Sequence, residues 1–111
     1  MKRINTIKPH REFDEIISHG TKLRSPHYAC FYKTNDLGYT RIGLAVGKAN
    51  GGAVKRVRIK RQVRAMLAKR NDYSLPVSII IVIRPNYVAS EFHANEEELN
   101  TLLDQIKDNQ H

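Results

Sequence analysis

The sequence predicts a small α+β protein in which helices pack against one sheet. Segments whose apolar residues recur with helical spacing alternate along the chain with segments of strand character. Their order is one helix, two or three strands, a second helix, one strand and a last helix. The 111 residues contain no repeat, low-complexity segment or linker, and they suffice for one modest core. We therefore expect residues 1–111 to form a single domain.

The first helix is expected directly after a basic arm at residues 1–8. Pro9 suits a first helical turn, and Gly20 suits a helix end. The apolar stripe between them contains Phe13, Ile16 and Ile17. This spacing predicts a helix of about ten residues.

Strand character marks three further segments. Residues 22–33 and 41–46 alternate between two kinds of side chain, and the turn-forming residues 35–38 separate them. Residues 77–83 form a continuous apolar run, which is typical of a strand buried on both faces. Cys30 is the single cysteine, so no internal disulfide can form, and its apolar neighbours predict a buried position.

The last helix is predicted from its first residues. Asn95 and, three positions later, Glu98 match a capping box, in which each side chain bonds the backbone N–H of the other residue. The apolar stripe that follows contains Leu99, Leu102, Leu103 and Ile106. We therefore expect a helix that begins near Asn95.

The positive charge of the chain is concentrated in its middle. The net charge is +8 and the sequence pI about 9.9. No Asp or Glu occurs from Leu37 to Asn71, whereas six acidic residues and only one lysine, Lys107, occur from Glu91 onward. A folded protein with such a regional field repels itself unless a polyanion neutralises the charge.

Helical spacing orders this basic region. One apolar stripe contains Ile59, Val63, Met66 and Leu67. The cations on the other sides of the helix and in the glycine-rich loop before it are Lys48, Lys55, Arg56, Arg58, Lys60, Arg61 and Arg64. Guanidinium groups bind phosphate oxygens through paired hydrogen bonds and stay charged at any working pH. The pattern predicts a helix, running to about Arg70, that packs on the core by one face and binds nucleic acid by the other.

Sequence signals for other chemistry are weak. The loop at residues 47–54 has neither the Walker spacing nor the dinucleotide-binding spacing of glycines. The five histidines lack metal-ligand spacing, and nothing sets two of them together as acid and base. No apolar run has membrane-spanning length, and no secretory signal is present. These observations predict a cytoplasmic binding protein without a catalytic residue, metal site, protein-bound cofactor or membrane partner.

The segment from Gly52 to Arg64 resembles the signature of the bacterial ribonuclease P protein subunit, Gly-Ala-Val-x-Arg-x-Arg-Ile-Lys-Arg-x-x-Arg. The resemblance extends over nearly the whole chain. It includes the first helix with its exit at residues 19–21, the aromatic strand at 28–32, and the strands at 41–44 and 79–84. It implies a fold of the ribosomal protein S5 domain 2-like type, an α-β-β-β-α-β-α two-layer sandwich with a left-handed βαβ crossover.

The resemblance also implies a function. In this family a catalytic RNA removes the 5′ leader of precursor tRNA, with Mg²⁺ held through the RNA. The protein is then expected to bind the catalytic RNA by its basic helix and loop, and the single-stranded leader in a cleft between the first helix and the sheet. The residues expected at this cleft are Lys8, Arg11, Phe13, Ile17, Ala29, Phe31 and Arg41. Aromatic and apolar side chains suit unpaired bases, and cations suit phosphates. For Phe13 and Phe31, plain core packing is the alternative.

The chain departs from the family pattern in the loop and in the basic helix. The departures are Gly47, Ala49, Gly52 and Val57, where polar side chains or a cation are usual. Val57 is expected on the exposed side of the helix, among the cations. Two other interpretations stay open: a ribosomal or other structural RNA-binding protein of the same fold, and a ribonuclease that acts through its own histidines.

Overall fold

The computed structural model describes residues 5–8 and 10–110. Its elements in chain order are α1 (His10–His19), β1 (Thr21–Arg24), β2 (Tyr28–Thr34), β3 (Arg41–Val46), the short 3₁₀ helix η2 (Lys48–Asn50), α2 (Ala53–Ala68), β4 (Val77–Ile83) and α3 (Phe92–Asp108). The first helix of ten residues and the strands at residues 41–46 and 77–83 are thereby confirmed.

The four strands form one sheet in the order β1-β2-β4-β3. β2 pairs antiparallel with both β1 and β4, whereas β3 pairs parallel with β4. Parallel neighbours need a crossover connection, and α2 supplies it between β3 and β4. This βαβ unit belongs to the fold that the resemblance implies, and it leaves β3 at an edge of the sheet.

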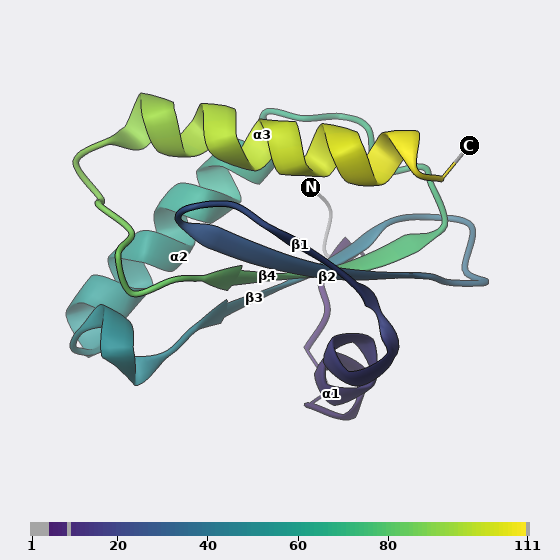
Figure 1. Ribbon diagram of the computed structural model, residues 1–111, viewed down its shortest axis with the longest axis horizontal. Helices are drawn as coiled ribbons and strands as arrows, with labels where there is room; N and C mark the ends of the chain where they lie inside the picture. Colours follow the sequence, from purple (N-terminus) through teal and green to yellow (C-terminus); the bar gives the residue numbers. More distant parts are fainter. Residues whose placement is uncertain (1–4, 9, 111) are drawn as a thin grey trace.

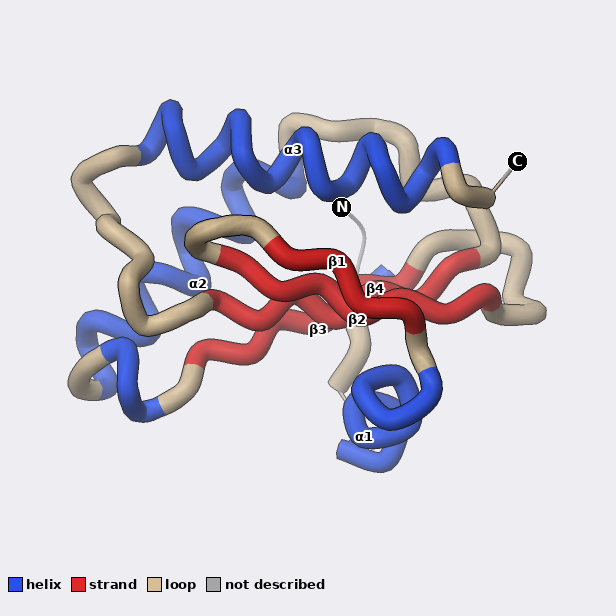
Figure 2. The backbone as a smooth tube through the Cα atoms, viewed as in Figure 1, coloured by secondary structure: helices blue, strands red, loops and turns tan. Residues whose placement is uncertain are grey.

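Helices lie on both faces of the sheet (Figure 1). α2 and α3 cover one face and form the main two-layer sandwich, while α1 covers part of the other face. The tube in Figure 2 makes the separation plain, because the red strands lie between α1 and the two longer helices.

Alternation along the strands divides the core in two. Tyr28 and Cys30 of β2 face the main core with α2 and α3. Ile80 of β4 faces the other way and packs with Ile7 and Ile16 in a smaller core under α1. β4 is therefore buried on both faces, as its apolar run predicts. Burial raises the pKa of the Cys30 thiol to about 12, and the predicted core position of this residue is confirmed.

The strand pattern at residues 22–33 consists of two strands, so three strands precede α2, as the α-β-β-β-α-β-α order predicts. β1 and β2 form a hairpin in which Thr21 pairs with Tyr32 and Arg24 with Ala29. Pro26 lies in the turn, where it has no N–H to contribute to a strand ladder. Side-chain alternation continues on both sides of such a turn, so the pattern alone does not locate it.

The predicted start of the last helix is wrong by three residues. α3 begins at Phe92, and no side chain caps it. Asn95 lies in its first turn and donates its side-chain N–H to the carbonyl of Val88 at 2.8 Å. Glu98 accepts hydrogen bonds from the β1–β2 turn. Both side chains are thus engaged in contacts outside the capping box, and such contacts compete with local capping.

Candidate nucleic-acid interface

α2 has one apolar and one cationic side, as its sequence predicts. Its buried residues are Ile59, Val63, Met66 and Leu67. Val57 is 53 % exposed, which confirms its placement on the solvent side among the cations. Val54 is 87 % exposed on the first turn of the same helix. The solvent side of α2 therefore combines cations with two exposed valines.

The cations of α2 and its loop are not neutralised by carboxylates. The seven predicted residues are Lys48, Lys55, Arg56, Arg58, Lys60, Arg61 and Arg64. None of them forms an ion pair with a residue of the described ranges 5–8 and 10–110. Nε of Arg56 is in addition buried without a hydrogen-bond partner within that part of the chain.

Carboxylates elsewhere in the protein do pair with cations. The pairs outside the interface include Glu15 with Lys33 at 2.9 Å, Glu12 with Arg41 at 2.6 Å, Glu96 with Lys69 at 2.9 Å, and Asp104 with Arg70 at 2.8 Å. The cations of α2 and its loop thus form a cluster without compensating carboxylates, and such a cluster attracts a polyanion.

The loop before α2 is anchored to the end of the sheet. Asn50 is buried, and its side-chain N–H donates to the carbonyl of Arg84 at 2.9 Å. Gly51 has a φ of +124°, a conformation that favours glycine. Gly52 precedes α2 and provides no side-chain cap for the first N–H groups of the helix. These N–H groups, with the positive end of the helix dipole, add to the attraction for anions near the loop cations.

A groove of about 810 Å³ adjoins the cationic side of α2. It lies between α1, the edge strand β3 and α2, whose residues together line it. Lys8, Phe13 and Ile17 from the predicted cleft lie in its wall, and so do Lys60 and Arg64 from α2. Apolar surface and cations therefore share one groove, as binding of a single-stranded nucleic acid requires.

Arg41 lies outside this groove and has its own partners. Its guanidinium donates two hydrogen bonds to the Glu12 carboxylate, at 2.6 and 2.8 Å, and a third to the carbonyl of Thr6 at 3.1 Å. It lines a separate hollow together with Glu12 and Glu15. The sequence pattern did not predict these hydrogen bonds, because Glu12 lies 29 positions from Arg41 along the chain.

The other three predicted cleft residues also lie apart from the groove lining. Phe31 packs against the smaller core, and Nζ of Lys22 lies 5.2 Å from the centre of its ring. Ala29 is half-buried on the same strand, and Arg11 is exposed on α1. Core packing therefore accounts for part of the Phe31 surface, and a role of these residues in leader binding stays a prediction.

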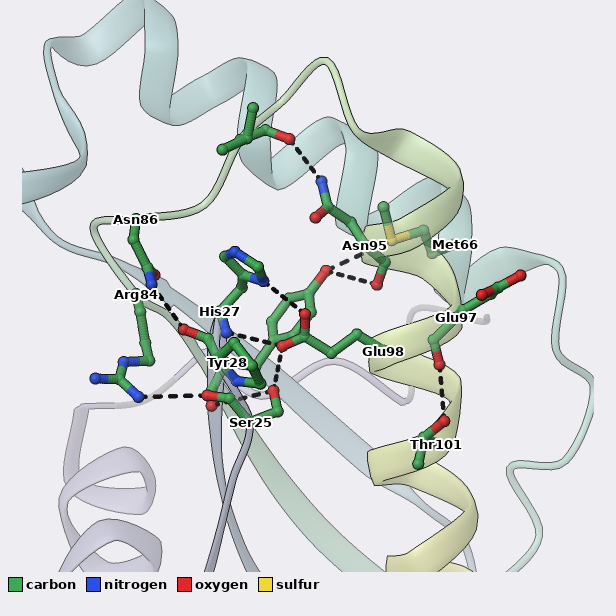
Figure 3. A network of polar contacts seen from close by, with 12 residues as sticks. Ser25, His27, Tyr28, Met66, Arg84, Asn86, Asn95, Glu97, Glu98 and Thr101 are labelled. Atoms are coloured by element: carbon green, nitrogen blue, oxygen red, sulfur yellow. Dashed lines mark hydrogen bonds and ion pairs between the residues drawn. The ribbon is translucent and has the colours of Figure 1, made fainter.

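Sequence reasoning missed a polar cluster that joins α3 to the β1–β2 turn (Figure 3). The Glu98 carboxylate accepts hydrogen bonds from the hydroxyl of Ser25 and from the backbone N–H of His27, and one of its oxygens lies 2.6 Å from Nδ1 of His27. Burial tends to raise the pKa of Glu98, but these hydrogen bonds outweigh burial and lower the pKa. The nearer of these partners is 71 positions from Glu98, so no local spacing reveals the cluster.

In the described ranges, no three His, Cys, Asp or Glu side chains gather in a way that could hold a metal ion. Nor does any helix of those ranges have the length and apolar character needed to cross a membrane.

The fold and this surface define a class of protein: a small α+β protein with an uncompensated cationic helix beside a groove, suited to a polyanionic partner. Residues 1–107 match the family model described as Ribonuclease P. The chain belongs to the ribonuclease P protein family. It is therefore a protein subunit of an endoribonuclease, the ribonucleoprotein that removes the 5′ leader from precursor tRNA.

Known relatives are similar to this chain over nearly their full length. The ribonuclease P protein component of Mesoplasma florum is 38 % identical over 105 residues, which cover 93 % of this chain and 96 % of the relative. That of Mycoplasma mycoides subsp. mycoides SC is 32 % identical, with 96 % and 100 % covered. The RNase P protein of Thermotoga maritima has the same fold, with a TM-score of 0.80 at 24 % identity and coverage of 90 % and 96 %. The alternative of a ribosomal protein of the same fold is not favoured.

Proposed function

We propose that the cationic side of α2 and its loop bind the catalytic RNA of ribonuclease P, and that the groove beside α2 holds the single-stranded leader of precursor tRNA. One observation carries the proposal: the seven cations of α2 and its loop lack carboxylate partners within the described residues. RNA phosphates supply the missing negative charge.

The groove suits an unpaired strand better than a duplex. Phe13 and Ile17 of α1 offer apolar surface for bases, while Lys60 and Arg64 of α2 line the same groove and offer cations for phosphates. Because Lys60 and Arg64 belong to α2, the leader and the catalytic RNA would bind to adjoining parts of one helix. The protein then holds the substrate strand next to the RNA that cleaves it.

We further propose that catalysis belongs to the RNA, with Mg²⁺ held through the RNA rather than by this chain. The proposal rests on the residues of the described ranges, where no group of His, Cys, Asp or Glu is placed to hold a metal. The same function would place the protein in the cytoplasm, where precursor tRNA is made.

Reconstitution tests the proposal. Precursor tRNA is incubated with the protein alone, with the cognate RNA alone, and with both, in the presence of Mg²⁺. We expect rapid release of the leader only when RNA is present, and tighter substrate binding when the protein is added. Cleavage by the protein alone that persists with ribonuclease inhibitors would overturn the assignment of catalysis to the RNA.

A further inference from the structure

The groove contains one residue that phosphate binding does not explain. Among the described residues its titratable lining consists of the cations Lys8, Lys60 and Arg64, the imidazole of His10 and a single carboxylate, Asp14. A carboxylate repels the phosphates of any strand that enters, so Asp14 opposes the attraction that its neighbours provide. Its presence therefore calls for a partner other than phosphate.

No contact with the described residues gives Asp14 a structural role. It is exposed and forms no hydrogen bond or ion pair with the described residues, not even with Arg11 one helical turn earlier. It is the fifth residue of α1, beyond the first turn in which a carboxylate gains from the helix dipole. Glu12 and Glu15 of the same helix, by contrast, are paired with Arg41 and Lys33.

The surroundings of Asp14 are those of a base-binding position. Phe13 directly precedes Asp14 on α1, and Ile17 lies about one turn after it; both residues line the groove. A base that packs on this apolar surface can bring its edge to the carboxylate, and Lys60 and Arg64 of the same groove offer cations for phosphates of the strand.

The chemistry of a carboxylate selects among the four bases. An ionised carboxylate only accepts hydrogen bonds, through two oxygens side by side. Guanine is the base whose Watson–Crick edge presents two adjacent donors, N1–H and the N2 amino group, which fit both oxygens at once. Adenine and cytosine each place an acceptor beside their amino group, and uracil places its single N–H between two acceptors, so each leaves an acceptor against the carboxylate.

We propose that Asp14 is a specificity-determining residue that binds guanine in the single-stranded leader. The proposal rests on the proposed function of the groove. An asparagine presents one donor and one acceptor, so it cannot accept from both donors of guanine at once, and its pair is complementary to the amino group and ring nitrogen that adenine and cytosine both present. Asp14→Asn should therefore abolish the guanine preference at the same leader position.

The experiment uses the holoenzyme reconstituted with the cognate RNA and precursor tRNAs whose leaders consist of uridine except for one position. Guanine, adenine or cytosine is placed at each leader position in turn, and relative kcat/KM values are measured by competition. For the wild type we expect one position at which guanine is favoured by about 5- to 100-fold, the range for a paired hydrogen-bond contact. Asp14→Asn should lose the preference for guanine there. Asp108→Asn, an exposed carboxylate on α3, is the matched control and should keep the guanine preference.

The outcomes separate this inference from the function on which it rests. If a longer leader does not improve substrate binding in the wild type, the groove does not hold the leader, and both proposals fail. If the leader improves binding but no position favours guanine, or the guanine preference survives in Asp14→Asn, then the role of Asp14 is wrong while leader binding stands. A preference for cytosine would likewise overturn the assignment of guanine.

Discussion

The ring of Phe13 packs directly against Gly43: a Cβ atom at position 43 would lie 2.5 Å from Cζ of Phe13 and 2.9 Å from Cδ1 of Ile80. No side chain fits at this point of β3, so α1 can approach the sheet closely only because residue 43 is glycine. The groove wall that contains Phe13 is set by this contact.

Gly43→Ala should therefore destabilise the protein and displace α1. We expect the free energy of unfolding to fall by about 1–3 kcal/mol, as for other overpacked sites, measured by urea denaturation. Gly47→Ala is the control, because a Cβ there meets nothing within 4 Å and the φ of −77° suits alanine. That variant should stay within about 0.5 kcal/mol of the wild type. Equal stability of the two variants would contradict the packing of Phe13 on the sheet.

The Glu98 cluster predicts a dependence of stability on pH. The pKa of Glu98 is lower in the folded protein than the ordinary value of 4.5. The contribution of Glu98 to the free energy of unfolding is therefore complete above pH 4.5 and is lost as the pH falls through the folded pKa. Glu98→Gln should lower the free energy of unfolding at pH 7 by about 1–3 kcal/mol, since hydrogen bonds to a charged group are replaced by neutral ones. The variant should also lose less stability than the wild type between pH 5 and 3 (about the range over which carboxylates titrate).

Glu97→Gln is the matched control for that measurement. Glu97 is the neighbouring residue on α3 and is exposed. Its substitution should change neither the stability at pH 7 nor the acid limb of the pH profile. If both variants behave alike, the contacts between Glu98 and the β1–β2 turn do not contribute to stability.

The salt dependence of RNA binding tests the cationic side of α2. Arg61→Gln should weaken binding to the ribonuclease P RNA and reduce the slope of log K against log salt by about 0.7–0.9, the value for one phosphate contact. We expect the same of Arg58, Lys60 and Arg64. Lys69→Gln is the control, because Lys69 lies at the end of the same helix but is paired with Glu96. A loss of affinity at Arg61 without a change in slope would indicate contact with a base.

Local periodicity explains which parts of the fold were predictable. The stripe of α2 from Ile59 to Leu67 recurs every three or four residues, and the structure buries all four of its members. The strand at residues 77–83 was likewise predictable from a local feature, its continuous apolar run. The position of the turn at Pro26 could not be located, because side-chain alternation continues on both sides of it.

The candidate site was likewise predictable only where it depends on local helical spacing. Helical spacing assigned the cations of α2 to its solvent side, and it placed Phe13 and Ile17 on one face of α1. It could not show that Arg41 is engaged by Glu12 or that Asp14 has no partner among the described residues. These facts depend on how α1 is oriented against the sheet, which is a property of the tertiary structure.

Val57 offers the most specific test of how α2 meets RNA. It is 53 % exposed within the cationic side, at a position where the family resemblance implies a polar side chain. Val57→Asn should change the free energy of unfolding by no more than about 0.5 kcal/mol, because the side chain is not part of the core. Binding to a generic bacterial ribonuclease P RNA should strengthen by about 0.5–1.5 kcal/mol, the net value of one added hydrogen bond.

Titration of the wild type and of Val57→Asn against the generic and the cognate RNA decides the matter. Stronger binding of the variant to the generic RNA would support docking of α2 in the usual family geometry. Weaker binding to the cognate RNA would show that this RNA has an apolar surface opposite Val57, since an amide buried there without a partner loses its hydrogen bonds to water. Unchanged binding to both RNAs would place Val57 outside the contact, and α2 would then face the RNA through Arg58 and its neighbours rather than through the side that contains Val57.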